Sequence, residues 1–271
     1  MRRPATKIVL AAVALGALAI GVAGAMRAAK DDAPCGAGFE RVGMRCFPEK
    51  SNGVCSPPPR TLVRVPKTKV VIGPSDWEAE GRVKPRTVEA GPFDIDAYEF
   101  ARGDLGSHLP GDGTPTDGCR AASRIDLAEA RAFCKDRGGR LPTEDEWIVA
   151  AAGDRPRRYP WGDTGAVCRR AAWGLVRGPC GRGAEGPDTV GSHPDGKTPL
   201  GIHDLAGNVA EWVETGVCTG ALGGECIGVV RGGSYETDLA TDLRTWVRRE
   251  VSWASKDPAI GFRCAYDVAV K

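Results

Sequence analysis

Histidine is scarce in this 271-residue chain, which contains only His108, His193 and His203. These three are too scattered along the sequence to form a recognisable set of metal ligands. His193 and His203 fall in loop-like segments, where a histidine is either a ligand or a surface or hydrogen-bonding residue. The chain has ten cysteines but no C-x-x-C pair, so the spacing expected of zinc ligands is also missing.

The chain also has little net charge. It contains 37 basic and 35 acidic residues, and three of the basic ones, Arg2, Arg3 and Lys7, stand at the N-terminus. Without these three, 34 basic residues face 35 acidic ones. A near-neutral domain argues against a nucleic-acid-binding surface. No internal repeat is visible, and the length suits one globular domain or two small ones.

The N-terminal 26 residues form a targeting segment. Basic residues precede an apolar run, Ile8–Met26, and Ala23–Ala25 has the small-residue form of a signal-peptidase site. The run is also long enough to cross a bilayer uncleaved. Residues 1–26 are therefore either a signal peptide or an N-terminal membrane anchor acting through residues 8–26. Both alternatives predict an exported chain that is periplasmic, secreted or membrane-anchored facing outward.

The rest of the chain divides at a proline-rich stretch. Residues 27–60 carry three cysteines and end in Pro57-Pro58-Pro59-Arg60, which predicts a small cysteine-containing cap and a stiff linker. Residues 61–271 form the main domain. An even number of cysteines in an exported chain indicates disulfides.

Helix and strand signals in the main domain predict an α+β fold. Thr61–Gly73 holds two β-rich runs separated by a proline, and Gly91–Phe100 alternates as a half-buried strand does. Two capping boxes, Ser123–Asp126 and Thr143–Glu146, each precede a helical pattern. Residues 153–228 are mostly loop. Patterns typical of strands occur again in the last part of the domain, at residues 226–230, 243–248 and 261–267.

Four segments follow one another along the chain: GGRLPTEDEWIVAAAG (138–153), YPWGD (159–163), GIHDLAGNVAEWVE (201–214) and VVRGGSYE…GFRCAYD (229–267). In this order they resemble the formylglycine-generating enzyme, or sulfatase-modifying factor, family. One such motif arises by chance, but four in order with sensible spacing are specific. The resemblance implies a loop-rich, disulfide-stapled variant of the C-type-lectin-like fold.

The resemblance also implies where catalysis would reside. Family enzymes oxidise a substrate cysteine to formylglycine with two cysteines and a copper ion, shortly after the Gly-Gly-Ser-aromatic motif. Thr237 and Asp242 occupy the matching positions, and no cysteine lies between Cys226 and Cys264. A hydroxyl and a carboxylate do not replace thiolates as soft copper ligands or nucleophiles. We therefore expect neither bound copper nor formylglycine generation, and we name no catalytic residue.

A calcium ion is the cofactor that the resemblance favours. Family members hold calcium with the loop that matches DLAGNVAEW. The implied ligands are the side chain of Asp204, the carbonyl groups of Gly207 and Val209, and the carboxylate of Glu211. Hard oxygen ligands from a tight turn suit calcium. The alternative is that Asp204 and Glu211 only cap backbone amides. A second family calcium site uses an asparagine where this chain has Ala171.

The resemblance implies one disulfide, between Cys134 and Cys264. The other cysteines suggest pairs by proximity along the chain. These are Cys168–Cys180, Cys218–Cys226 and Cys35–Cys46, with Cys55–Cys119 left over. Sequence alone does not fix such pairings.

Two functions remain open at this point. The first is an exported, non-catalytic pseudoenzyme whose calcium-stabilised scaffold binds a protein or glycan of the cell envelope. The second is an oxidoreductase of the formylglycine-generating or non-haem metal family with altered chemistry, using carboxylates such as Asp238 and Asp242. Four arginines near the C-terminus either line a cleft or form an ion-paired surface: Arg244, Arg248, Arg249 and Arg263.

Overall fold

A computed structural model describes residues 39–42, 45–48, 50–51, 54–55, 57–73, 84–108, 118–214, 216, 218 and 226–268. The chain divides into two units, 1–34 and 35–271, and every described residue lies in the second. The predicted targeting segment, residues 1–26, and Cys35 lie outside the described residues. Among the helices that are described, none is long and apolar enough to cross a membrane.

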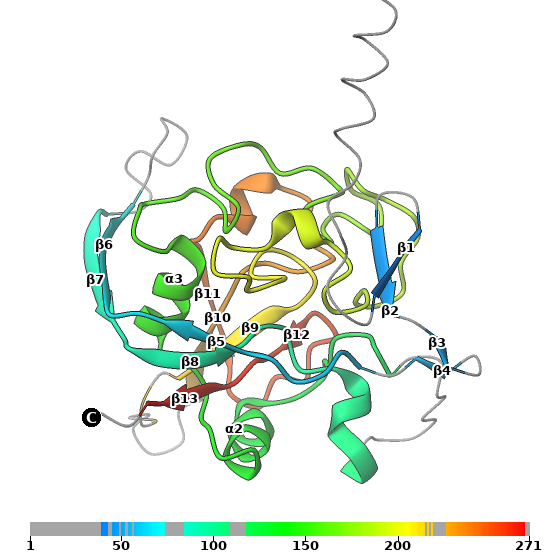
Figure 1. Cartoon of the computed structure of the whole chain (residues 1–271), viewed down its shortest axis with the longest axis horizontal. Helices are drawn as coiled ribbons and strands as arrows, with labels where there is room; N and C mark the ends of the chain where they lie inside the picture. Colours follow the sequence, from blue (N-terminus) through cyan, green and yellow to red (C-terminus); the bar gives the residue numbers. More distant parts are fainter. Residues whose placement is uncertain are drawn as a thin grey trace, which may run out of the picture. The chain divides into compact units, whose positions relative to one another are not determined.

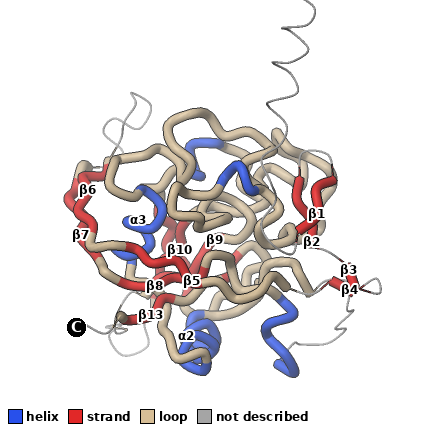
Figure 2. The backbone as a smooth tube through the Cα atoms, viewed as in Figure 1, coloured by secondary structure: helices blue, strands red, loops and turns tan. Residues whose placement is uncertain are grey.

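Short strands and two α-helices make up the regular structure. The strands are β1 (Phe39–Val42), β2 (Arg45–Pro48), β3 (Lys50–Ser51), β4 (Val54–Cys55), β5 (Leu62–Val65), β6 (Thr68–Ile72), β7 (Arg86–Ala90), β8 (Phe93–Asp96), β9 (Ala210–Val213), β10 (Ile227–Arg231), β11 (Arg248–Ser252), β12 (Ile260–Gly261) and β13 (Ala265–Asp267). The α-helices are α2 (Leu127–Asp136) and α3 (Glu144–Ala152). Short 3-10 helices are η1 (Arg102–His108), η3 (Pro194–Gly196) and η4 (Ala240–Leu243). Most of the rest of the described chain is loop, drawn in tan in Figure 2.

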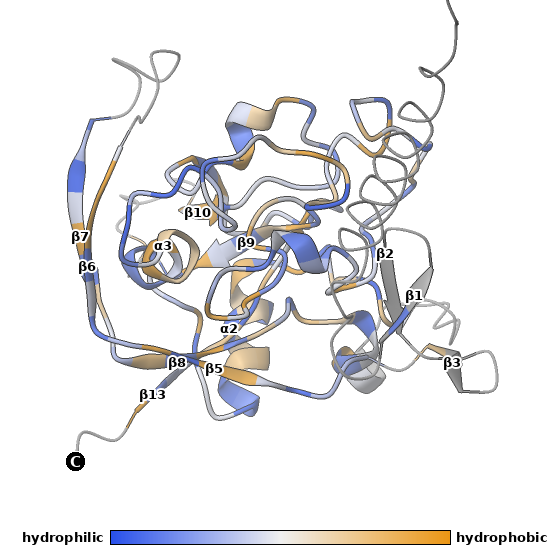
Figure 3. Ribbon diagram, turned by 45° about the horizontal axis from the view of Figure 1, so that its top comes forward, coloured by the Kyte–Doolittle hydropathy of each residue, from blue (hydrophilic) through white to orange (hydrophobic). Residues whose placement is uncertain are grey.

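Two sheets form the centre of the domain (Figure 1). One has the strand order β11-β10-β9-β12 and the other the order β13-β8-β5. β9 pairs antiparallel with β10 and parallel with β12, so segments far apart in the sequence become neighbours. The hairpin β6–β7 curves around α3 and contacts it along both strands. Hydrophobic and hydrophilic residues both occur along this hairpin (Figure 3), as expected for strands with one buried face.

Helix α3 begins as its sequence predicts. Thr143 is the N-cap and accepts a hydrogen bond from the Glu146 amide, while the Glu146 carboxylate accepts one from the Thr143 amide at 2.8 Å. Every residue from Glu146 to Ala152 is buried. A helix that is buried all round must pack on several elements. It therefore anchors one hydrophobic cluster, together with residues of β5 to β10.

Helix α2 begins later than its sequence suggests. The N-cap is Asp126 and the capping partner is Glu129, so the predicted box at Ser123–Asp126 is wrong. The reason lies at Arg124, whose φ of 60° is a left-handed conformation that a right-handed helix cannot include, and whose amide donates to the distant carbonyl of Asp257. The predicted apolar face is correct at Leu127, Ala130 and Cys134, which are buried in a second cluster with Phe262.

The strand near the C-terminus is also shifted from its expected place. The sequence predicts a strand over 243–248, but a 3-10 turn occupies Ala240–Leu243 and β11 begins at Arg248. Trp246 lies in the connecting turn and is 4% exposed. Its indole joins the cluster around α3, so its burial comes from tertiary packing and not from a strand.

Two disulfides among the described residues join segments that are far apart in the chain, and two join segments that are close in sequence. Cys134 in α2 is bonded to Cys264, at an S–S distance of 2.01 Å and a sequence separation of 130. The other disulfides are Cys55–Cys119, Cys168–Cys180 and Cys218–Cys226. All four pairings agree with those expected from the sequence. The fifth expected pair, Cys35–Cys46, involves a residue outside the described ranges.

We predict that the Cys134→Ala/Cys264→Ala variant loses about 4 to 5 kcal/mol of unfolding free energy, because this bridge closes a long loop in the unfolded chain. The matched control is Cys218→Ala/Cys226→Ala, whose partners are separated by 8 residues. The same loop-entropy relation gives about 2 to 3 kcal/mol for that bridge. Urea unfolding of both variants measures the difference, and equal losses would contradict the prediction.

Candidate functional site

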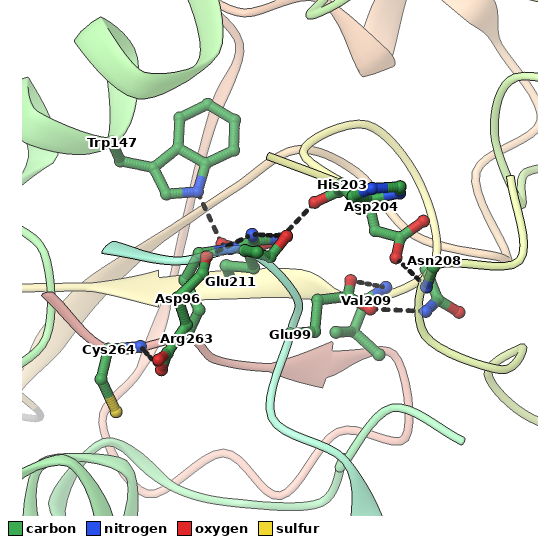
Figure 4. Close-up of polar contacts among 12 residues, drawn as sticks. Asp96, Glu99, Trp147, His203, Asp204, Asn208, Val209, Glu211, Arg263 and Cys264 are labelled. Carbon is green, nitrogen blue, oxygen red and sulfur yellow. Dashed lines mark hydrogen bonds and ion pairs between the residues drawn. The ribbon is translucent and has the colours of Figure 1, made fainter. Parts of the chain in front are cut away.

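Three of the sequence motifs meet at one buried ion pair (Figure 4). Arg263 follows β12, Glu211 lies in β9, and both side chains are at most 1% exposed. The guanidinium donates from Nε to Oε2 at 2.8 Å and from Nη2 to Oε1 at 2.7 Å. Trp147 of α3 donates its indole N–H to the same carboxylate at 2.8 Å. This two-point geometry is the strong form of an arginine–carboxylate contact.

The remaining donors of Arg263 bind backbone carbonyl groups. Nη2 also donates to the carbonyl of His203 at 2.8 Å, and Nη1 donates to the carbonyl of Asp96 at 3.2 Å. Burial lowers the pKa of Arg263, but Glu211 outweighs burial and the pKa ends above its ordinary value. A fully hydrogen-bonded, permanently charged side chain in the interior serves architecture. Of the two alternatives for Arg263, lining a cleft is wrong, and the ion pair is present but lies in the interior instead of at the surface.

The loop before β9 is held by backbone geometry and by Glu99. Asn208 donates from Nδ2 to one carboxylate oxygen of Glu99 at 2.5 Å, and the amide of Val209 donates to the other at 3.1 Å. Gly207 has φ 84°, and a Cβ there would lie 2.4 Å from the carbonyl oxygen of Ala172, so only glycine fits. Glu99 lay within a predicted strand, where no sequence pattern distinguished it as a partner of this loop.

Acidic groups outnumber basic ones around this loop. Glu99, Asp204 and Glu211 are all buried, while Arg263 is the guanidinium that pairs with them. Burial raises the pKa of Asp204 to about 7, and the neighbouring carboxylates contribute to the shift. The pKa of Glu99 is likewise raised by burial and then by Asp204 and Glu211. A divalent cation would offset this excess of negative charge.

The four predicted calcium ligands lie on one continuous loop and strand. Asp204 has φ 58° and accepts a hydrogen bond from the amide of Gly191 at 2.6 Å. Glu211 is already engaged by Arg263 and Trp147. The described residues contain no group of three or more His, Cys, Asp or Glu side chains arranged to hold a metal ion. The expected ligands are oxygen atoms and the surroundings are acidic, as calcium sites require. Calcium binding itself stays a prediction.

The second family calcium position has no oxygen-bearing side chain. Ala171 is 1% exposed and packs in an apolar cluster with Tyr159 and Trp173. The buried residues of this cluster include no carboxylate or amide side chain that could bind calcium.

The histidines that can be described are buried. His203 stacks on Tyr98 with ring centroids 4.8 Å apart, and burial lowers its pKa to about 4, so it is neutral near pH 7. His193 lies between Ser192, with Oγ 3.0 Å from Nδ1, and Asp188, with Oδ2 4.0 Å from Nε2. This order resembles a hydrolase triad, but Ser192 is 0% exposed, so no substrate carbonyl can reach its hydroxyl.

The positions of the missing thiols lie at a separate surface pocket. Thr237 and Asp242 line a cavity of about 390 Å³, together with Gly232–Ser234 and the ends of β10 and β11. The Thr237 hydroxyl accepts a hydrogen bond from the Ser234 amide at 2.9 Å, which ties the turn after the glycine pair. Asp238, the other carboxylate that we considered as a metal ligand, lies beside Gly178 and is not among the lining residues.

Arginines surround this pocket, partly as the sequence suggests. Arg248 and Arg249 line it, whereas Arg244 is 6% exposed and is not part of the lining. Arg231 also lines the pocket, and sequence reasoning missed it. Its only signal was its place before the glycine pair, at the end of a β-branched run.

Solved structures place the chain in the class of loop-rich α+β proteins with a C-type-lectin-like fold. PvdO from Pseudomonas aeruginosa superposes with a TM-score of 0.60 at 21% identity, over 76% of this chain and 94% of that one. A likeness at this identity establishes the fold alone.

Residues 52–268 match the sulfatase-modifying factor enzyme 1-like domain, and the chain belongs to this family. The inactive C-alpha-formylglycine-generating enzyme 2 of Bos taurus is 34% identical over 146 residues, which cover 51% of this chain and 47% of that protein. The hercynine oxygenase of Mycolicibacterium thermoresistibile is 38% identical over 91 residues, covering 32% and 19% respectively. The chain thus spans about half the length, or less, of these curated relatives.

We predict that Glu211→Gln and Arg263→Met each lower the unfolding free energy by about 3 to 5 kcal/mol, because each leaves a buried charge without its partner. The double variant should lose less than the sum of the two, since no isolated charge then remains. Guanidinium unfolding at fixed calcium concentration measures this coupling, and additive losses would sink the prediction. The exposed pair Arg64–Asp94 provides the control, where Arg64→Met should have little effect.

Proposed function

We propose that this chain is an exported, non-catalytic member of its family, and that its calcium-braced domain binds a protein or glycan of the cell envelope. The observation that carries the proposal is the pair Thr237 and Asp242 at the pocket where family enzymes place two cysteines. The Thr237 hydroxyl is engaged within a turn, and neither group supplies a soft copper ligand. An inactive relative from Bos taurus, similar over about half of this chain, fits the same view.

Export is supported by the N-terminal sequence and by cysteine usage. An apolar run of targeting character precedes a domain with four disulfides among its described residues. Disulfides persist in oxidising compartments, such as the periplasm or the outside of the cell. Outside the cytosol no thiol reductant breaks these disulfides, so the domain stays cross-linked. This supports a scaffold role at the envelope.

The alternative is an oxidoreductase with altered chemistry. It requires a metal held by replacement ligands near Thr237. Asp242 lines the pocket, but Asp238 does not, and the described residues include no further His, Cys or acidic group that would complete a metal site there. The alternative therefore rests on one carboxylate and serves as the opposing outcome of the following test.

We expect the purified protein, supplied with copper and oxygen, to leave a cysteine-containing sulfatase peptide unoxidised. The Thr237→Cys/Asp242→Cys variant should gain stoichiometric Cu(I) binding, because it restores soft thiolate ligands at the pocket. Mass spectrometry of the peptide and copper analysis of both proteins provide the readouts. Formylglycine in the peptide, or stoichiometric copper in the unaltered protein, would overturn the proposal.

Calcium binding is predicted to raise the melting temperature. Saturation at about a hundredfold excess over Kd adds about 2.7 kcal/mol, which corresponds to about 5 to 10 °C for a domain of this size. Asp204→Asn should abolish the shift, whereas Asp195→Asn, at a partly exposed acid outside the ligand set, should retain it. Scanning calorimetry with calcium or chelator measures the shift. An unchanged melting temperature with no bound calcium in the purified protein would refute the prediction.

A further inference from the structure

Two neighbouring cavities share a wall and together form what we call the cationic cleft. One, of about 390 Å³, contains Thr237 and Asp242. The other, of about 520 Å³, lies between the loop end of the β6–β7 hairpin, at Ile72 and Arg86, and the start of β11. Arg231, Val247 and Arg248 line both cavities. The two cavities therefore lie side by side, and a ligand that enters both must be longer than either one.

Positive charge exceeds negative charge along this cleft. Its acidic lining residues are Glu144 and Asp242. Its basic lining residues are Lys84, Arg86, Arg231, Arg248 and Arg249. The excess is local, because the chain as a whole carries 37 basic and 35 acidic residues. A cleft lined by one sign of charge concentrates ligands of the opposite sign.

Among the arginines that line the cleft, Arg249 has the guanidinium that is most accessible to a ligand. Its side chain is 52% exposed, and its nearest acid, Asp257, lies 3.9 Å away. Arg248, by comparison, is held by Glu144 at 3.1 Å and by Glu250 at 2.7 Å. Arg249 can therefore reach a ligand carboxylate without first breaking a close hydrogen bond.

Arg231 supplies a second, independent indication of a ligand. Its side chain is 2% exposed, yet it lines both cavities. Nη2 binds Glu144 and Nη1 donates to the carbonyl of Val247 at 3.2 Å, but Nε has no hydrogen-bond acceptor among the described residues. Burial lowers the pKa of this guanidinium, and Glu144 opposes the shift. A buried donor without an acceptor is costly, so an incoming carboxylate oxygen would be favoured there.

The backbone beside the cleft is an open sheet edge. β11 stands at the end of its sheet and pairs with β10 on one side only, within the part of the chain that is described. Figure 1 shows the two strands side by side. Arg248 faces Arg231 and Arg249 faces Val230 in the register, so the edge strand begins where the basic residues gather. An exposed strand edge can pair with an extended segment of another chain.

We propose that the cationic cleft binds an extended acidic peptide segment of a partner protein, which adds a strand to the free edge of β11 and places carboxylates on both faces of the sheet, against Arg231 on one face and Arg249 on the other. This inference rests on the proposed binding function and names the chemistry of its partner. A peptide supplies main-chain groups for the strand edge, and its carboxylates match the planar fork of arginine. A sulfated glycan would supply anions but no main-chain partners for β11.

The test uses the full chain, residues 1–271, with its disulfides formed. The probe is a fluorescent peptide of eight residues in which pairs of aspartates alternate with pairs of valines, so that carboxylates lie on both faces of the added strand, compared with its asparagine counterpart. We expect the acidic peptide to bind about tenfold more tightly at low salt, with the difference shrinking as ionic strength rises. Equal binding of the two peptides would overturn the proposal.

Matched variants locate the binding site. Arg249→Gln should weaken binding of the acidic peptide about fivefold. Arg169→Gln, at a similarly exposed arginine that is 3.5 Å from Asp195 and outside the cleft, should leave it unchanged. Arg231→Lys keeps a buried positive charge but lacks the guanidinium fork, and it should also weaken binding. Equal effects at Arg249 and Arg169 would contradict the assignment to the cleft.

Two further readouts test the mode of binding. Peptide binding should slow amide hydrogen exchange in Arg248–Ser252, and N-methylation of alternate peptide residues should abolish binding. Tighter binding of a sulfated disaccharide than of the peptide would replace the peptide with a glycan and overturn this inference. The non-catalytic function would survive either failure, since only copper binding or peptide oxidation contradicts it.

Discussion

The Glu211–Arg263 ion pair is the contact on which the rest of the domain depends. It joins β9 to the segment between β12 and β13, and the indole of Trp147 brings in α3. The same guanidinium donates to the carbonyl oxygen of His203, which precedes β9, and to that of Asp96, which ends β8. A buried pair of this kind contributes less to net stability than to the choice of one packing, because any other arrangement would strand a charge in the interior. The disulfide from Cys264 to α2, one residue along from Arg263, fixes the same junction covalently.

This arrangement separates the family's architecture from its chemistry. Trp147, Glu211 and Arg263 come from three recognisable motifs, yet all three serve the core. The residues that would decide catalysis, Thr237 and Asp242, lie at a surface pocket whose turn is held by a hydroxyl hydrogen bond and glycine geometry. Loss of thiols at that pocket removes no contact from the core. The motifs that build the core can therefore be kept while the residues at the pocket differ.

The sequence predicted features controlled by local rules and missed those controlled by tertiary contacts. Thr143 and Glu146 are three residues apart, so their capping box is readable from the sequence and α3 begins there. The start of α2 was misplaced because the left-handed conformation of Arg124 depends on surrounding contacts. Partners such as Glu99 and Asn208 are 109 residues apart, and no local pattern links them. The resemblance to a family supplied the Cys134–Cys264 pairing, which spacing alone could not.

The distribution of charge connects the interior with the cleft. The described residues bury more acids than bases: Asp96, Glu99, Glu146, Asp188, Asp204 and Glu211 against Arg231, Arg244 and Arg263. A chain with nearly equal numbers of acids and bases must then expose a relative excess of bases. Part of that excess gathers at the ends of β10 and β11, where the family places its reactive pocket. An internal cation would complete the core without altering this surface. The acid-rich interior and the base-rich cleft therefore both follow from the uneven distribution of charged residues between interior and surface. The cleft attracts anions whether or not the pocket carries out chemistry.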